Sequence, residues 1–225
     1  MNYNYPQARE LTEILINAVK NKEGFFYLAV SGGSGASVLF KLWRDIYSAL
    51  IPWEKIELFW VDERCVPAEH PESNYGNAKK ELLDQVFVLE SRIHRIEGEN
   101  DNVQEASRYS KLVCELVPKY NSVPQFDMVI LGIGEDGHTS SIFPGQDHLL
   151  TYPEPYAPSV NPSSGQKRVA MTAPTILNAS ELVFYLYGES KKAILEKISV
   201  KSDNYSFPAL FFLENRLICR IFWDR

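Results

Sequence analysis

A chain of 225 residues with 45% hydrophobic and 23% charged residues has the composition of a soluble globular protein, long enough for one large α/β domain or two small ones. The net charge of −6 argues against nucleic acid as the main partner, and no apolar run approaches the ~18 residues that a membrane span needs. The cysteines are widely spaced and the N-terminus lacks a signal-peptide pattern, so we expect a cytoplasmic protein with reduced thiols.

The first elements are a helix, a strand and a glycine-rich turn. Apolar residues at helical spacing over 11–19 predict a helix, and the apolar run 25–30 predicts a buried strand. The strand leads into SGGSG at 31–35, after which a helical pattern resumes. Such a turn presents backbone N–H groups to an anion, although an ordinary flexible turn has the same composition.

A second apolar strand, 56–61, ends in three charged residues that include Asp62 and Arg64. They form either a solvated rim or part of a crevice, and we favour the crevice because ligands gather at the carboxyl ends of such strands. An arginine there can bind a phosphate or an oxyanion through two hydrogen bonds. Helices are expected from Ser73 onward and over 103–117.

The most informative stretch is 126–145, FDMVILGIGEDGHTSSIFPG. It begins as a buried strand over 128–131 and changes abruptly to closely spaced glycines that flank Asp136 and His138. The alternative interpretation is that Asp136 caps a helix starting near a surface-exposed His138. The strand and the glycines before this pair favour a functional site.

The last third begins with 146–166, rich in Pro, Ser and Tyr, which we expect to be a long loop with a binding or lid role. Strands are predicted over 169–172, 182–187 and 217–223, with a helix that ends near Ile198. The alternation predicts an α/β fold, a Rossmann-like α/β/α sandwich with a mainly parallel sheet, in which residues 1–225 form a single domain.

We expect the polar residues at these strand ends to share one pocket. No His, Cys, Asp and Glu spacing indicates a metal site, and no G-x-S-x-G motif indicates a serine nucleophile. What remains is a phosphate-anchoring pocket with a histidine whose ordinary pKa of about 6.5 suits proton transfer. Its candidate residues are Ser31, Gly32, Gly33, Ser34, Asp62, Arg64, Asp136, His138, Arg168 and Lys191.

The sequence resembles the 6-phosphogluconolactonases of the pentose phosphate pathway, which share a superfamily with the glucosamine-6-phosphate deaminases. The resemblance covers nearly the whole chain and depends on the order of motifs that are weak singly. These are SGGSGAS (31–37), FWVDERCVP (59–67), SNYGNAKKELL (73–83), LGIGEDGHTSSIFPG (131–145), KRVAMT (167–172) and GESKKAIL (188–195).

The resemblance implies hydrolysis of 6-phospho-D-glucono-1,5-lactone to 6-phospho-D-gluconate, without metal or cofactor. It implies that His138 is a general base oriented or supported by Asp136, and that Arg64 stabilises the oxyanion or the phosphate. Asp62 would hold Arg64 or a sugar hydroxyl. The 31–35 backbone, Arg168 and Lys191 would anchor the phosphate.

As partners we expect the sugar-phosphate lactone, no nucleic acid and no membrane, in a monomer or weak homo-oligomer. One departure concerns the first turn, where Gly35-Ala36 replaces the family's usual Thr-Pro and a hydroxyl is lost. A deaminase or isomerase on the same scaffold is the main alternative, and the continuation TSSIFP after His138 argues against it. A sugar-phosphate sensor and a nicotinamide enzyme are further alternatives; the absence of G-x-G-x-x-G disfavours the latter.

Overall fold

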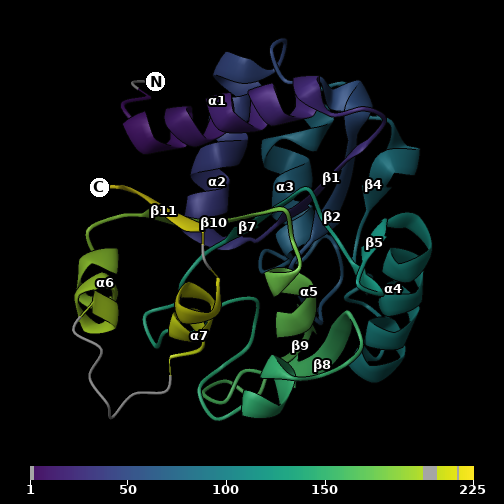
Figure 1. The fold of residues 1–225 in the computed structure, drawn as a ribbon, viewed down its shortest axis with the longest axis vertical. Coiled ribbons are helices and arrows are strands. Elements are labelled where there is room, and N and C mark those ends of the chain that lie inside the picture. Colours follow the sequence, from purple (N-terminus) through teal and green to yellow (C-terminus); the bar gives the residue numbers. More distant parts are fainter. Residues whose placement is uncertain (1–2, 200–206, 217) are drawn as a thin grey trace.

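The computed structural model describes residues 3–199, 207–216 and 218–225. Its centre is a six-stranded sheet in the order β11-β10-β7-β1-β2-β4, in which every neighbouring pair is parallel (Figure 1). The predicted α/β fold with a mainly parallel sheet is therefore confirmed. The strands are β1 (Phe26–Val30), β2 (Ile56–Trp60), β4 (Ile93–His94), β7 (Met128–Leu131), β10 (Glu181–Tyr187) and β11 (Cys219–Asp224).

The strand order reverses between β1 and β7. From β1 the chain first builds outward through β2 to β4, and it then returns to place β7 on the other side of β1, followed by β10 and β11. In doubly wound sheets, this reversal leaves a crevice beyond the carboxyl ends of the two central strands. The turn after β1 and the motif after β7 both lie at this position.

Helices flank the sheet. They are α1 (Pro6–Asn21), α2 (Gly33–Leu42), α3 (Asn74–Glu81), α4 (Asn102–Leu116), α5 (Ala173–Leu177), α6 (Lys191–Ser199) and α7 (Pro208–Asn215). Two adjacent residues of β2 show that α3 and α4 cover opposite faces, because successive side chains of a strand point to opposite sides. The Phe59 ring packs on Tyr109 of α4 with centroids 6.5 Å apart, and the Trp60 ring packs on Tyr75 of α3 at 5.3 Å.

A smaller antiparallel sheet in the order β3-β9-β8 joins the central one near its carboxyl edge, and β5 (Lys119–Tyr120) pairs with β6 (Val123–Pro124) as a short hairpin. Strand β3 (Asp62–Arg64) continues from β2, and β9 (Lys167–Met171) lies between β3 and β8 (Tyr156–Val160).

The expectation of one long loop over 146–166 is wrong. A short 3-10 helix (Asp147–Leu150) and β8 lie within it, and β8 packs against α4. Pro158 concealed the strand from sequence reasoning, because proline lacks the N–H of a strand ladder. It is tolerated because β8 is an edge strand of its sheet.

The end of β11 lies beside the start of α1 (Figure 1). The carboxylate of Asp224, at the end of β11, accepts hydrogen bonds from the backbone N–H groups of Gln7 at 3.0 Å and Ala8 at 2.8 Å. It thereby satisfies free donors at the start of α1. The predicted final strand over 217–223 is observed as β11, although residue 217 lies outside the described residues.

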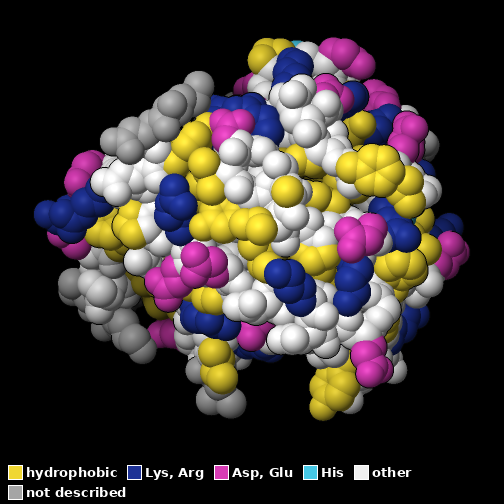
Figure 2. Space-filling model, turned by 90° about the horizontal axis from the view of Figure 1, so that it is seen from above, with side chains coloured by type: hydrophobic (Ala, Val, Ile, Leu, Met, Phe, Trp, Pro, Cys, Tyr) yellow, Lys and Arg dark blue, Asp and Glu magenta, His cyan; other side chains and the backbone are white. Residues whose placement is uncertain are grey.

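The face shown in Figure 2 carries basic and acidic side chains that are interspersed with apolar ones. Neither sign of charge forms a continuous patch in this view. Within the described ranges, no helix combines the length and apolar character needed to cross a bilayer.

Candidate active site

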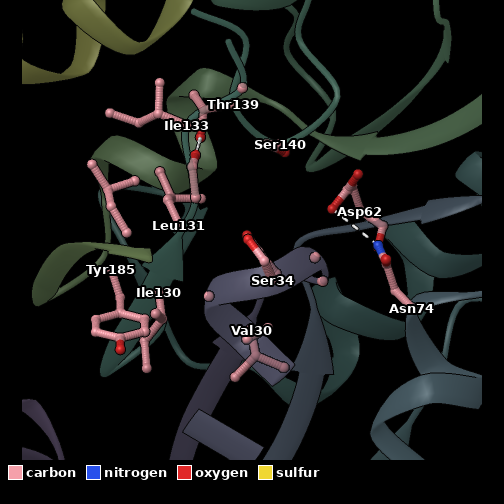
Figure 3. A pocket seen from close by; sticks show the side chains of 18 of the residues that line it. Val30, Ser34, Asp62, Asn74, Ile130, Leu131, Ile133, Thr139, Ser140 and Tyr185 are labelled. Carbon is pink, nitrogen blue, oxygen red and sulfur yellow. Dashed lines mark hydrogen bonds between the residues drawn. The ribbon is translucent and has the colours of Figure 1, made fainter. Parts of the chain in front are cut away.

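A cavity of about 210 Å³ lies at the carboxyl edge of the sheet, where the strand order reverses. Its walls come from the ends of β1, β7 and β10, the first turns of α2 and the corner between β3 and α3. Figure 3 shows Ser34 on the α2 side, Asp62 and Asn74 on another side, and Leu131 and Thr139 across from them. Segments distant in sequence thus contribute polar groups to one small space.

The β7 side of the cavity carries an imidazole and a carboxylate in direct contact. Nδ1 of His138 lies 2.5 Å from Oδ1 of Asp136. Burial works to raise the pKa of Asp136, but the hydrogen bond and the charge of His138 outweigh it, and the pKa lies below its ordinary value. An ionised carboxylate only accepts hydrogen bonds, so Nδ1 carries the proton of this contact, and in the neutral imidazole Nε2 is then the nitrogen with the free lone pair.

A glycine makes room for this pair. A Cβ at Gly134 would lie 2.2 Å from the Nδ1 atom of His138 and 2.7 Å from Oδ1 of Asp136. The Phe143 ring covers the imidazole with centroids 4.6 Å apart. The alternative of a capped helix at this point is wrong, because the chain continues into a turn closed by a bridge between Thr139 and Ile142.

Two serines after the histidine adopt left-handed backbone torsions, with φ of 51° at both Ser140 and Ser141. Such torsions cost on the order of 1–3 kcal/mol per non-glycine residue and persist only where surrounding bonds enforce them. Here the Ser140 hydroxyl donates to the Met171 carbonyl at 2.8 Å, and the Ser141 hydroxyl donates to Oδ2 of Asp62 at 2.5 Å. The serines therefore attach the histidine segment to β3 and β9.

The corner between β3 and α3 is built around the buried carboxylate of Glu63. Its Oε1 accepts from the backbone N–H groups of Arg64 and Asn74, both at 2.7 Å. Its Oε2 accepts from the Ser73 hydroxyl at 3.0 Å and the Tyr75 N–H at 2.8 Å. Burial raises the pKa of Glu63, and the three backbone bonds oppose that rise. The carboxylate thereby joins the start of α3 to the strand that carries Asp62 and Arg64.

Asp62 is held by neutral partners within the described residues. Besides the bond from Ser141, its Oδ1 accepts from Nδ2 of Asn74 at 3.3 Å, and its carbonyl accepts from the same nitrogen at 2.8 Å. We expected Asp62 to hold either Arg64 or a sugar hydroxyl. The expectation for Arg64 is wrong, because its guanidinium instead donates to the Glu72 carbonyl at 2.5 Å.

The β1 side offers backbone donors. Gly32 precedes the first residue of α2 and no side chain caps this helix start. Gly33 has φ of +87°, a torsion that requires glycine. The hydroxyl of Ser31 is buried and has no hydrogen-bond partner among the described residues. Gly35 lets α2 approach β10 closely, since a Cβ there would lie 3.0 Å from the Tyr185 carbonyl oxygen.

Two arginines lie opposite each other, Arg64 on β3 and Arg168 on β9. Burial and the neighbouring Arg64 charge lower the pKa of Arg168. The Nε atoms of both arginines are buried and find no partner among the described residues. Lys191, at the start of α6, lines the cavity and donates to the Ile133 carbonyl at 2.8 Å. Two like charges side by side with free donors favour an anion between or beside them.

All but two of the ten predicted site residues line the cavity. Asp136 contacts the cavity through His138, and Arg168 is the cross-strand neighbour of Arg64. Sequence reasoning missed Asn74, Ser141 and Glu63. Ser73 as the residue capping α3 was predictable, but no sequence signal pairs its neighbour Asn74 with Asp62. In the part of the chain that is described, no three His, Cys, Asp or Glu side chains are grouped to hold a metal ion.

The strand order and the open donors define a Rossmann-like α/β protein with a candidate anion-binding site at its switch point. More particularly, the chain belongs to the glucosamine-6-phosphate isomerase/6-phosphogluconolactonase family, whose model matches residues 5–222. The resemblance seen in the motifs is thus confirmed.

Individual relatives agree with the family. The chain is 37% identical to a 6-phosphogluconolactonase of Haemophilus influenzae over 187 residues, which cover 81% of this chain and 78% of the relative. It is 31% identical to a 6-phosphogluconolactonase of Treponema pallidum over 205 residues, which cover 90% of this chain and 84% of the relative. The structure is similar to that of a 6-phosphogluconolactonase from Trypanosoma cruzi, with a TM-score of 0.83, 26% identity, and coverage of 97% of this chain and 90% of that one.

Proposed function

We propose that this protein hydrolyses 6-phospho-D-glucono-1,5-lactone to 6-phospho-D-gluconate. The observation that carries the proposal is the contact of 2.5 Å between His138 and Asp136 in a cavity whose opposite wall offers free N–H groups. The names of the relatives point to the same reaction.

In the proposed mechanism, Nε2 of His138 takes a proton from the water that attacks the lactone carbonyl carbon. A bond forms between the water oxygen and that carbon, and the carbonyl oxygen becomes an oxyanion. As the ring C–O bond breaks, the imidazolium returns its proton to the departing ring oxygen. The lowered pKa of Asp136 supports this role, because an ionised carboxylate stabilises the imidazolium that forms.

The phosphate would bind where donors lack partners. The first N–H groups of α2 and the Ser31 hydroxyl supply neutral donors. Arg64, Arg168 and Lys191 supply positive charge. Asp62 would accept a hydrogen bond from a sugar hydroxyl, since its carboxylate is oriented by Asn74 and Ser141. This chemistry requires neither a metal nor a cofactor, because histidine supplies the base and N–H groups or guanidinium stabilise the oxyanion.

The test is hydrolysis of freshly generated lactone by the wild type and His138→Ala, each corrected for spontaneous opening. We expect the substitution to lower kcat about 10²–10⁴-fold, the usual contribution of a general base, while binding of 6-phosphogluconate is retained. His148→Ala is the matched control, because this exposed histidine lies in the 3-10 helix after the motif. Equal rates in the wild type and His138→Ala would refute the assignment.

The alternative reaction on this scaffold is deamination of glucosamine 6-phosphate. It predicts ammonia release from that sugar and no acceleration of lactone opening. A folded wild type that opens the lactone at the background rate but releases ammonia would replace our proposal with this one.

A further inference from the structure

One asparagine contacts both walls of the cavity. Asn74, the first residue of α3, is 2% exposed and donates from Nδ2 to both the carbonyl and the carboxylate of Asp62. Its other side-chain atom, Oδ1, is buried without a hydrogen-bond partner among the described residues. Figure 3 shows the amide beside Asp62 at the edge of the cavity.

The buried oxygen lies against Gly32. A Cβ built on Gly32 would be 1.9 Å from Oδ1 of Asn74 and 2.3 Å from its Cγ. The backbone of Gly32 has φ of −95° and ψ of −164°, which any L-residue adopts. Glycine is therefore needed at this position to make room for Asn74. The adjacent Gly33 differs, because no atom lies within 4 Å of its Cβ position and its φ of +87° alone requires glycine.

We infer that Asn74 is a positioning residue that couples the anion-binding turn after β1 to Asp62. Its amide nitrogen fixes the Asp62 carboxylate, and its oxygen fixes how closely the turn approaches β3. One side chain would thereby set the distance between the turn that binds the phosphate and the carboxylate that binds a sugar hydroxyl. The role in catalysis rests on the proposed function, whereas the coupling between the two walls rests on geometry alone.

Two substitutions separate the contacts. Asn74→Ala removes both of them. Asn74→Asp keeps the volume beside Gly32 but places a second carboxylate oxygen where Nδ2 donates to Asp62, so only the Asp62 contact is lost. We expect both variants to lower kcat for lactone opening by about 10- to 100-fold, because misplacement of a substrate-orienting group has effects of this size.

The decisive experiment is a double-mutant cycle with Gly32→Ala, measured as the Kd for 6-phosphogluconate by calorimetry and as KM for the lactone. We expect Gly32→Ala to weaken binding on the order of tenfold in the wild type, where the methyl group meets Asn74, within the range of coupling between contacting residues. The same substitution should change binding less than about twofold in Asn74→Ala, where the methyl group has space. In the Asn74→Asp background, Gly32→Ala should again weaken binding on the order of tenfold, because the side chain beside Gly32 is restored.

The matched control is Asn77→Ala, in the same helix. Asn77 also bonds through its side chain, donating to the Pro71 carbonyl at 2.9 Å, but this bond does not involve Asp62. We expect it to leave the effect of Gly32→Ala unchanged. Melting temperatures of the four cycle members give a second readout if Gly32→Ala folds poorly, since Asn74→Ala should then restore part of its stability.

Additive effects of Gly32→Ala and Asn74→Ala on Kd and on melting temperature would overturn the inference. Failure of the proposed function is a different result. A wild type that binds 6-phosphogluconate without opening the lactone would refute the hydrolase assignment, and the binding cycle would still decide the coupling.

Discussion

The carboxylates in and beside this cavity have their hydrogen-bond partners within the protein, whereas several donors of the cavity have none among the described residues. On the β3–α3 side, the Glu63 carboxylate accepts four hydrogen bonds and Asp62 is held by Asn74 and Ser141. On the donor side, the start of α2 has no capping side chain, and the Nε atoms of Arg64 and Arg168 lack partners within the described chain.

This difference supports the proposal that the cavity binds an anion. A buried polar group without a partner costs about 1–3 kcal/mol, so a fold that satisfies its carboxylates but not its cations is completed by an anion. The Asp62 carboxylate lines the cavity and, held by Asn74 and Ser141, is an oriented acceptor for a hydroxyl group. A phosphorylated polyhydroxy compound fits both halves, and the following predictions test this comparison in order of decreasing effect.

The largest effect is expected at Arg168. Replacement by Gln removes a buried cation next to Arg64, so binding of 6-phosphogluconate should weaken about 10- to 100-fold, equivalent to the loss of a hydrogen bond to a charged group. The ligand-free melting temperature should stay unchanged or rise, because burial and the Arg64 charge already disfavour the Arg168 cation and lower its pKa. Calorimetry and thermal melts check both statements.

Arg95→Gln is the control for Arg168, since Arg95 pairs with Glu99 on another part of the surface. It should leave binding unchanged. A large drop in the ligand-free stability of Arg168→Gln would show that Arg168 already has stabilising partners within the protein. That result would contradict the contrast between satisfied carboxylates and unsatisfied cations.

The second prediction concerns the Glu63 carboxylate, which accepts four hydrogen bonds. Glu63→Gln turns one accepting oxygen into an NH₂ group that faces N–H or O–H donors, so at least one buried donor loses its partner. We expect a loss of about 1–3 kcal/mol in the free energy of unfolding, measured by urea titration. Glu81→Gln, at the last residue of α3 and half-buried, should cost less. Unchanged stability in Glu63→Gln would mean that the four bonds contribute little.

The turn itself should be strained by a side chain at Gly33. Gly33→Ala forces a left-handed torsion on alanine and should cost about 1–2 kcal/mol of unfolding free energy. Gly132→Ala is the matched control, because its Cβ position is equally open but its φ is not in the left-handed region. Urea titration of the two variants should separate them, and equal losses would contradict the torsional explanation.

The smallest effect concerns pH and Asp136. Because the pKa of Asp136 is lower in the folded protein than the ordinary value of 3.8, its stabilising contribution is complete above that value and is lost as pH falls through the folded-state pKa. The stability difference between the wild type and Asp136→Asn should therefore narrow between pH 6 and about pH 3. Urea titrations across this interval test the sign, and a difference that widens toward acid pH would contradict it.

The sequence by itself determined the alternation of strands and helices and where the chemistry lies along the chain. Buried parallel strands have continuous apolar runs, and their ends change abruptly to glycine and charge, so β1, β2, β7 and β10 and the residues after them were predictable. The strand β8 was not, because Pro158 lies in it and only its edge position makes that proline acceptable.

Tertiary structure alone decided which polar groups meet. Arg64 and Arg168 become neighbours through the pairing of β3 with β9, and Ser141 reaches Asp62 only because the segment after β7 turns back over β3. The glycines of the first turn look alike in sequence, yet Gly33 serves a backbone torsion and Gly32 makes room for Asn74. Local patterns report the torsions and burial of one segment, whereas the space beside an atom depends on what the rest of the chain packs there.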